Sequence, residues 1–342
     1  MTLNKNRIIG IDYARAFFSV CVVAIHCGFF FILPSNIFNP EVYDRHTFEL
    51  TDFITFYIFM LAVPVFFIIS NYLFACKPYD WHDLGKRLFR YIKLFLFWSI
   101  IYNLLASGII LYPHNIIEAV ILFLNGNKTI YWFFVSLGIL TIIAHFSKRL
   151  SNLYLILLAV FSTFLVGILP IISIRYKFYS LTNNWNPLNF LPFPFIAIII
   201  QRLKNHDVRS LFWNLLIMFL IVFTFLTAVL DWTIYVDKGF FQINLFAMPA
   251  YPRPSLILLS ALVLVLVVNF QFKQLCIVTF MAKHSLALYC LHFFFLSIGF
   301  KIANIFETSD ISHWLVSLIT VTLLSYIVSI ILPQILNKDL IR

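Results

Sequence analysis

Residues 8–30 have the sequence IIGIDYARAFFSVCVVAIHCGFF. This stretch is predominantly apolar and is longer than the roughly 20 residues that a helix needs to cross the hydrocarbon of a bilayer. Three ionisable side chains, Asp12, Arg15 and His26, interrupt it. Such groups are costly in hydrocarbon unless they are paired or face a cavity. We therefore expect a membrane-spanning helix whose polar residues point into the protein.

The rest of the chain has the same apolar character. It is 62% hydrophobic and 11% charged, with a mean hydropathy of +0.95, whereas soluble domains carry roughly 25% charged residues. The sequence therefore predicts an all-α, polytopic membrane helix bundle, a single transmembrane domain over residues 1–342 without a soluble domain. About ten spans are expected, at 8–33, 53–75, 88–110, 130–147, 152–171, 189–203, 211–230, 255–270, 281–301 and 312–336.

The distribution of basic residues indicates the orientation of these spans. Under this topology 17 of the 24 Lys and Arg fall on the side that holds the N-terminus, with only 5 of the 14 acidic residues. The positive-inside rule then predicts that both termini are cytoplasmic, and an even number of spans agrees. Because the basic residues lie in short loops, the net charge of +10 does not indicate a nucleic-acid partner. Segment 111–128 is too short and polar to span and is expected either to be re-entrant or to lie at the interface.

The first helix places its polar residues along one face. Arg15 and His26 are eleven residues apart, close to three helical turns, and at about 1.5 Å per residue they are separated by about 16 Å. Asp12 precedes Arg15 by one turn, where an i,i+3 ion pair would lower the cost of both. In the alternative interpretation, Asp12 and Arg15 are interfacial and His26 is a hydrogen-bonded packing residue.

Several kinds of site are not indicated. No spacing of Cys and His predicts a metal, and neither a G-x-S-x-G elbow nor a phosphate-binding P-loop is present. The five cysteines are expected to be packing residues. Six histidines fall in loops or at span ends, where a solvated imidazole needs no explanation: His46, His82, His145, His206, His284 and His313.

Motifs along the chain resemble those of the acyltransferase 3 family of membrane proteins. The first helix carries the R-x10-H spacing of that family between Arg15 and His26. Four further segments match in order: VPVFFIISNYLF at 63–74, KRLFRYIK at 86–93, YWF at 131–133 and SLALYCLH at 285–292. Ala16 and Asn71 occupy positions where the family has Gly, so packing or the substrate surface beside Asn71 is expected to differ.

The resemblance implies a membrane O-acyltransferase, most simply an O-acetyltransferase, of the bacterial cytoplasmic membrane. It implies acetyl-coenzyme A or another acyl-CoA as co-substrate without a bound cofactor, and a glycan or lipid-linked sugar as acceptor. His26 is then the expected base, with Arg15 and Asp12 beside it. Alternatively, His26 carries the acyl group transiently as an acyl-imidazole. Arg87 and Arg90 are expected to bind the phosphates of the donor. Alternatively, they only anchor the helix at the cytoplasmic side, as the positive-inside rule predicts for basic residues.

Residues of two other helices are expected to line the substrate cavity: Ser70, Tyr72, Ser285, Tyr289 and His292. The last three are at i, i+4 and i+7 and so share a helix face. Alternatively they form a hydrogen-bond ladder between helices. From another class of function, a transporter of a carbohydrate or lipid-linked sugar would also have many spans and buried ionisable residues, and a non-catalytic scaffold is a third hypothesis. Apart from membrane lipids, no further partner and no oligomeric state is indicated.

Overall fold

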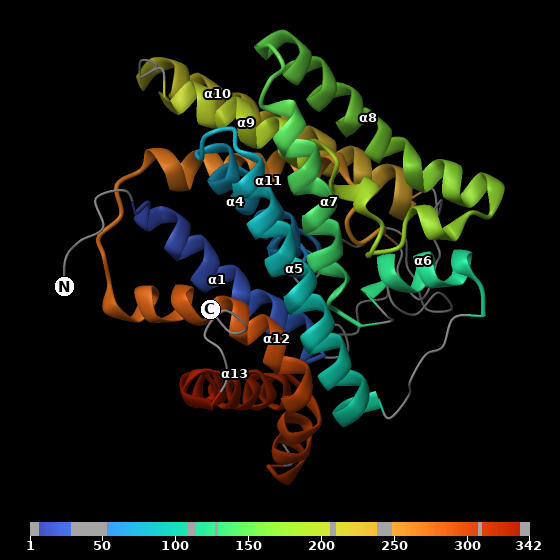
Figure 1. Ribbon diagram of the computed structural model, residues 1–342, viewed down its shortest axis with the longest axis vertical. Helices are drawn as coiled ribbons and strands as arrows, with labels where there is room; N and C mark the ends of the chain where they lie inside the picture. Colours follow the sequence, from blue (N-terminus) through green and yellow to red (C-terminus); the bar gives the residue numbers. More distant parts are fainter. Residues whose placement is uncertain are drawn as a thin grey trace.

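The computed structural model describes residues 7–28, 53–107, 114–126, 129–205, 210–237, 248–306 and 310–335. In these ranges every regular element is helical, as the all-α prediction requires (Figure 1). Parts of three predicted spans, at 29–33, 108–110 and 336, lie outside the described residues, as do most of the two terminal tails.

Each of the ten predicted spans contains a helix. The helices are α1 (Ile9–His26), α4 (Ala62–Ala75), α5 (Trp81–Tyr102), α7 (Trp132–Ser147), α8 (Asn152–Tyr176), α9 (Pro192–Asn205), α10 (Ser210–Asp231), α11 (Pro254–Asn269), α12 (Cys276–Ile305) and α13 (Asp310–Ile335). Within the described residues, seven helical segments are long and apolar enough to cross a membrane, while α7 and α11 are shorter apolar helices. The helix in the sixth predicted span, α9, has only 14 residues.

Segment 111–128, which was not expected to span the membrane, contains one short helix, α6 (Ile116–Leu124). Its nine residues would rise about 14 Å, less than half of the hydrocarbon thickness. The Asn115 side chain caps it by accepting a hydrogen bond of 2.8 Å from the Glu118 amide. The short α6 is thus consistent with an interfacial position.

Three groups of helices build the bundle (Figure 1). At one side α1 packs along α12, and α12 packs along α13. α8 and α10 lie at the opposite side, with α4, α5 and α7 between. The apolar side chains of α10 are largely exposed, as expected of a helix that faces lipid, whereas α4 is largely buried.

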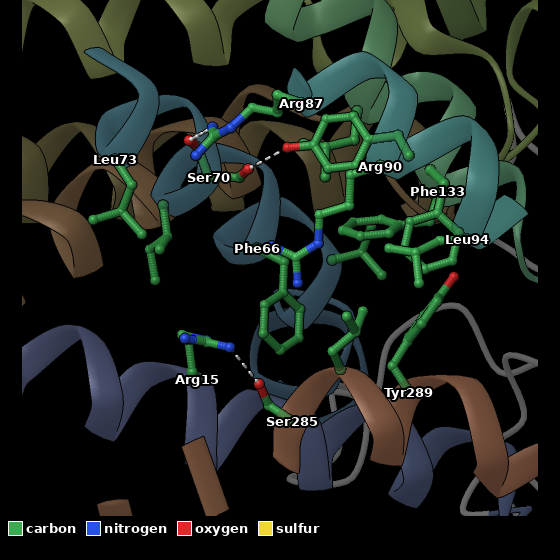
Figure 2. A pocket seen from close by; sticks show the side chains of 16 residues that line it. Arg15, Phe66, Ser70, Leu73, Arg87, Arg90, Leu94, Phe133, Ser285 and Tyr289 are labelled. Carbon is green, nitrogen blue, oxygen red and sulfur yellow. Dashed lines mark hydrogen bonds between the residues drawn. The ribbon is translucent and has the colours of Figure 1, made fainter. Parts of the chain in front are cut away.

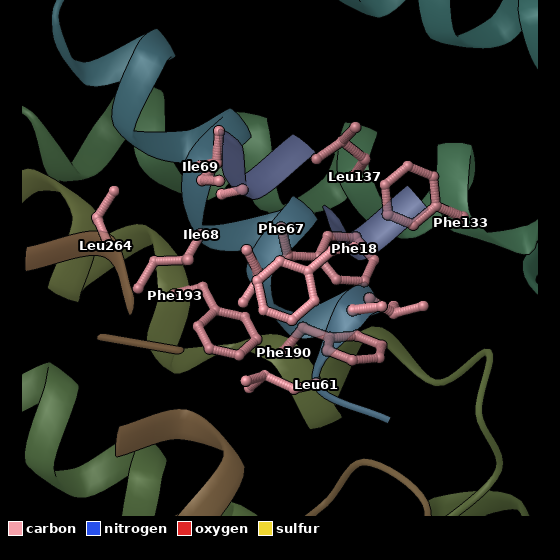
Figure 3. Close-up of a cluster of buried hydrophobic side chains, with 14 of the residues drawn as sticks. Phe18, Leu61, Phe67, Ile68, Ile69, Phe133, Leu137, Phe190, Phe193 and Leu264 are labelled. Atoms are coloured by element: carbon pink, nitrogen blue, oxygen red, sulfur yellow. The ribbon is translucent and has the colours of Figure 1, made fainter. Parts of the chain in front are cut away.

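The apolar core surrounds α4 (Figure 3). The ring of Phe67 lies 4.7 Å from that of Phe133 on α7 and 4.3 Å from that of Phe190, which ends the 3₁₀ turn η5 (Pro187–Phe190). All three rings are buried. Because α4 contacts α1, α7, α9 and α11 at once, it holds the helices that carry the polar residues in fixed relation.

Gly10 allows α1 to approach α11 at backbone distance. A Cβ atom at this position would lie 2.1 Å from the carbonyl oxygen of Val267 and 2.9 Å from the ring of Phe272. No side chain fits there without moving one of the two helices. Gly10 therefore sets the depth at which α1, with Arg15 and His26, sits in the bundle.

Candidate active site

Five helices, α1, α4, α5, α7 and α12, line a cavity of about 270 Å³, which we call the arginine cavity because three arginines face it (Figure 2). Arg15 reaches it from α1, whereas Arg87 and Arg90 reach it from α5. Ser70 of α4 and the pair Ser285 and Tyr289 of α12 complete its polar lining. Its apolar walls come mainly from Phe66, Leu94, Phe133, Phe134 and Leu137. The structure thus brings together six residues that the sequence assigned to three roles, namely catalysis, donor binding and the substrate cavity.

Arg15 is held by a neighbouring helix rather than by its own. Its guanidinium donates a hydrogen bond of 3.1 Å to the Ser285 hydroxyl, which in turn donates to the carbonyl of Ala282 at 2.9 Å. Figure 2 shows Arg90 extending from α5 into the space above this pair. The positive charges of Arg15 and Arg90 therefore point into the same cavity from opposite walls.

The second wall is organised by Ser70. Its backbone carbonyl accepts a hydrogen bond of 3.1 Å from Arg87, and its hydroxyl lies 3.3 Å from the hydroxyl of Tyr91. The Arg87 guanidinium also lies over the ring of Phe74, 5.1 Å from its centre. The hydrogen bond to Ser70 and the contact with Phe74 fix the direction of Arg87, so that its guanidinium stays at the cavity wall.

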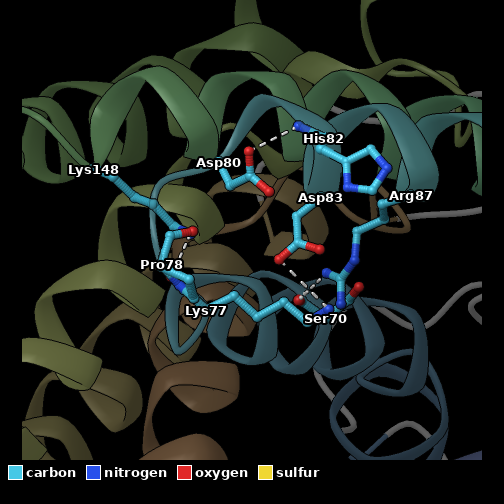
Figure 4. Close-up of polar contacts among 8 residues, drawn as sticks. All are labelled: Ser70, Lys77, Pro78, Asp80, His82, Asp83, Arg87 and Lys148. Carbon is cyan, nitrogen blue, oxygen red and sulfur yellow. Dashed lines mark hydrogen bonds and ion pairs between the residues drawn. The ribbon is translucent and has the colours of Figure 1, made fainter.

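The end of the bundle at which α1, α5 and α12 begin is called here the basic end; it lies beside the arginine cavity (Figure 4). Asp80 caps α5 by accepting from the His82 amide at 3.1 Å, and Lys77 pairs with Asp83 at 3.8 Å. The ammonium of Lys148 donates to the carbonyl of Lys77 at 2.9 Å. Partial burial, with the charge of Arg87 nearby, lowers the pKa of Lys148 to about 8. The basic end is therefore rich in positively charged side chains, which a bound anion would stabilise.

His26 lies deeper in the bundle and faces a second imidazole. The rings of His26 and His292 are 5.2 Å apart between centres and inclined by 31°, and Phe293 packs against His26 at 4.7 Å. His26 is half-buried, whereas His292 is fully buried. The Nδ1 atom of His292 lies 3.1 Å from the carbonyl oxygen of Leu288, and its Nε2 atom has no hydrogen-bond partner.

The tautomer of His292 follows from these contacts. A carbonyl oxygen can only accept, so Nδ1 must carry the proton that is donated to Leu288. In neutral His292 the Nε2 atom then has a free lone pair. His26 thus has a potential proton acceptor as its neighbour.

Five aromatic side chains lie beside the histidine pair and are called here the aromatic layer: Trp98, Tyr102, Tyr131, Phe293 and Phe294. The ring centres of neighbouring members are 5.9–6.4 Å apart. The Tyr131 hydroxyl donates to the carbonyl of Cys290 at 2.8 Å, which ties α12 to the segment before α7. The Tyr289 hydroxyl donates to the carbonyl of Ile130 and ties the same two segments.

Two details differ from the sequence-based expectations. Asp12 forms its ion pair with Arg7 at 2.5 Å instead of with Arg15, so the expected i,i+3 pair is absent. Tyr72 is buried in the apolar core and does not line the arginine cavity. At Asn71, where the family has Gly, the fully buried side chain donates from its nitrogen to the carbonyl of Phe67 at 2.9 Å, while its Oδ1 atom has no hydrogen-bond partner.

Two histidines that we expected to be solvated are buried. His145 packs between the rings of Tyr79 and Trp81, at 4.1 and 4.6 Å. His284 lies 2.9 Å from the hydroxyl of Ser329 and links α12 to α13. For His145 the expectation was wrong because residues around the start of α5 fold over the end of α7, and for His284 because α13 packs along α12. Hydropathy reveals neither contact.

A buried polar cluster away from the site was also missed. The guanidinium of Arg253 is fully buried and donates to the carbonyl of Phe56 at 2.7 Å, while Asp231 accepts from the Ser255 hydroxyl. Burial lowers the pKa of Arg253, and the carboxylate of Asp231 opposes this effect. The position of Asp231 within an apolar run was the available signal, because a carboxylate there needs a partner.

Comparison with known proteins gives one match. A family model described as an acyltransferase domain matches residues 8–332. No curated protein and no solved structure matches the chain. The matched range contains the arginine cavity, the histidine pair and the aromatic layer. Among the described residues, no three His, Cys, Asp or Glu side chains converge as a metal would require.

Proposed function

The chain belongs to the acyltransferase 3 family of membrane proteins, and from this we propose that it moves an acetyl group from acetyl-coenzyme A to a hydroxyl of a glycan or lipid-linked sugar. The arginine cavity is the proposed site of the donor, and His26 is the proposed base. Membership of this family favours acyl transfer over the transporter hypothesis. A longer acyl-CoA would use the same chemistry.

The charges around the arginine cavity support the donor assignment. Coenzyme A carries several phosphate charges at one end and its thioester at the end of a narrow arm. Guanidinium groups bind phosphate in forked geometry, and Arg15, Arg87 and Arg90 line one cavity near the basic end. The phosphates would bind there and the arm would extend into the bundle, toward the histidine pair.

One observation carries the proposal: α1 and α12 each line the arginine cavity and each contribute one residue to the histidine pair, at a different depth in the bundle. Arg15 and His26 are both on α1, and their separation of eleven positions corresponds to about 16 Å. On α12, Ser285 lines the arginine cavity and His292, two turns later, contacts His26. A donor held by its phosphates would thus present its thioester to the imidazole at the far end of its arm.

In the proposed reaction His26 removes the proton of the acceptor hydroxyl as the oxygen attacks the thioester carbonyl carbon. The carbon–oxygen bond forms, the tetrahedral oxyanion collapses, and the carbon–sulfur bond breaks. The thiolate of coenzyme A then takes the proton from His26, which regenerates the neutral imidazole. The acceptor leaves as an acetyl ester, so atoms and charges balance.

His292 is proposed to position and support His26. With Nδ1–H donated to Leu288, its Nε2 lone pair is available to the neighbouring imidazole, directly or through a water molecule. Such an acceptor would orient the ring of His26 and stabilise the imidazolium that forms during attack. Asp12, paired with Arg7, is too near the start of α1 to serve His26 in this way.

The proposal is tested with protein purified into nanodiscs, radiolabelled acetyl-coenzyme A and an alkyl glucoside as acceptor. His26→Gln should reduce acetyl transfer by about 10²- to 10⁴-fold, the usual contribution of a general base, with acetyl-coenzyme A still bound. His82→Gln is the matched control, because His82 is exposed at the basic end. Transfer that survives His26→Gln would refute the assignment of the base.

The donor site is tested separately. Replacing both Arg87 and Arg90 with glutamine should weaken the binding of acetyl-coenzyme A by about 10-fold or more, since charge-assisted hydrogen bonds to phosphate are lost. Lys86→Gln removes one positive charge from an exposed position of α5 and should have little effect. Equal affinities for all these variants would argue against donor binding in the arginine cavity.

We propose that the basic end faces the cytoplasm of a bacterial cell. The native cysteines of the chain allow this orientation to be tested. Cys76 and Cys276 are exposed at this end, whereas Cys21, Cys27 and Cys290 are buried. A membrane-impermeant maleimide should therefore label inverted membrane vesicles but not intact spheroplasts. Labelling of intact spheroplasts would show that the basic end faces outward. Cytoplasmic acetyl-coenzyme A could then not enter the arginine cavity from this end.

A further inference from the structure

A second cavity, of about 600 Å³, lies on the other side of the histidine pair and is called here the lysine cavity. α12 and α5, with the π-helical turn η2 (Asn103–Ser107) that continues α5, supply its lining. The lining residues that matter for recognition are Tyr102, Phe293, Ser297, Phe300, Lys301 and Asn304. The sequence did not indicate this cavity.

The two cavities follow one another along the same two helices. On α12, Ser285 and Tyr289 line the arginine cavity, whereas residues 293–304 line the lysine cavity, and His292 lies between. On α5, Arg90 belongs to the first cavity and Tyr102 to the second. A substrate in each cavity would therefore meet at the histidine pair.

The lysine cavity borders the proposed base through one aromatic side chain. Phe293 lines it and packs against the ring of His26, with 4.7 Å between ring centres. A hydroxyl held against Phe293 would be one side chain away from the imidazole. The ring of Phe293 thus separates the lysine cavity from the imidazole of His26 and contacts both.

The lining combines aromatic rings with a few polar groups, as is typical of small-molecule sites. Phe293, Phe300 and Tyr102 offer apolar faces that suit the C–H surface of a sugar ring. Ser297 and Asn304 are exposed on the same wall and can hydrogen-bond hydroxyl groups, with Asn304 oriented by His313 at 2.7 Å. These groups match the chemistry of a glycoside.

Lys301 gives the lysine cavity a positive charge, which favours anionic ligands. Its side chain is exposed, and no carboxylate of the described residues lies within ion-pair distance of its ammonium. It is also one of only 7 Lys and Arg on the side that the positive-inside rule predicts to be extracytoplasmic. A cation that lines a sugar-sized cavity would attract an anionic group on the ligand.

We propose that the lysine cavity binds the acceptor and that Lys301 selects sugars that carry a negative charge, as a uronic acid or a sugar phosphate does. This inference rests on the proposed function, because it names the acceptor class of the same reaction. The acceptor hydroxyl would face His26 while its anionic group contacts Lys301.

The test uses protein in phosphatidylcholine nanodiscs, radiolabelled acetyl-coenzyme A and three probes: hexyl β-D-glucoside, hexyl β-D-glucuronide and hexyl β-D-glucoside 6-phosphate. Wild type should acetylate an anionic probe with a kcat/KM about 5-fold above that of the neutral one, as expected for an exposed ion pair. The preferred probe distinguishes carboxylate from phosphate. Lys301→Ala should abolish the preference, and Lys301→Arg should retain it.

Arg175→Ala is the matched control, since Arg175 is exposed at the same side of the bundle on α8 and lines neither cavity. Binding of tritiated hexyl glucuronide is measured in parallel, so that acceptor recognition is read even if no transfer occurs. An unchanged preference and unchanged binding in Lys301→Ala would overturn the inference. Failure of acetyl-coenzyme A to bind would instead count against the proposed function.

An anionic lipid is the main competitor for Lys301. Nanodiscs with phosphatidylglycerol should leave the glucuronide preference intact if the lysine cavity holds a sugar. Lys301-dependent binding of phosphatidylglycerol, together with glycoside affinities that do not depend on Lys301, would overturn the inference and assign the cation to a lipid headgroup.

Discussion

Replacing Gly10 with alanine should impair acetyl transfer from a position outside both cavities. The added Cβ would lie 2.1 Å from the Val267 carbonyl oxygen, whereas ordinary van der Waals contact begins near 3.4 Å. α1 and α11 must therefore separate by about 1 Å, at a cost of roughly 1–3 kcal/mol for an overpacked contact. Because Arg15 and His26 are on α1, both would shift relative to α5 and α12. A misplacement of about 1 Å can lower the rate about 100-fold.

The assay measures kcat/KM for acetyl transfer together with the melting temperature in nanodiscs. Gly85→Ala is the control, because a Cβ at this helical position has nothing within 4 Å. This control should retain full activity and become slightly more stable, as alanine is the better helix former. Wild-type activity and stability in Gly10→Ala would refute the view that this close contact sets the position of α1.

Three further predictions concern individual side chains. Ser285→Ala should weaken acetyl-coenzyme A binding by about 10-fold in a direct binding assay, because it removes the hydrogen bond that orients Arg15. His292→Gln should lower kcat by about 100-fold while the dissociation constant of acetyl-coenzyme A stays unchanged, since the residue acts on His26 rather than on the donor. The pKa of Lys148 is lowered to about 8, so the unfolded chain binds more protons than the folded chain between about pH 8 and pH 10.5. The melting temperature should therefore contain a component that rises with pH in this window and is missing in Lys148→Met.

The sequence predicted the helices and part of the site because both depend on local periodicity. Each expected span contains a helix, since apolar length alone selects helices in a bilayer. Arg15 and Ser285 were expected in one site from spacing and family motifs, and they form a hydrogen bond. The pairing of Asp12 was not predictable in this way, because Arg7 lies before the helix and reaches the carboxylate from the preceding segment.

What the sequence did not reveal depends on packing between distant segments. The lysine cavity forms only where α5 and α12 pass each other, so Lys301 looked like an ordinary residue near a span end. Arg253 likewise appeared to be a loop residue, although its guanidinium is fully buried against the carbonyl of Phe56. Hydropathy describes single segments and carries no information about which segments meet.

The aromatic layer has an electrical consequence. With cavities on either side of the histidine pair, the tightly packed rings of Trp98, Tyr102, Tyr131, Phe293 and Phe294 leave little room for a continuous water path. In the proposed reaction an acetyl group leaves the donor and a hydrogen atom replaces it on sulfur, so no net charge passes the layer. A membrane voltage does work only on moving charge, about 2.3 kcal/mol per elementary charge and 100 mV. Acetyl transfer should thus proceed at the same rate in energised and depolarised vesicles, without dissipating the ion gradients of the cell.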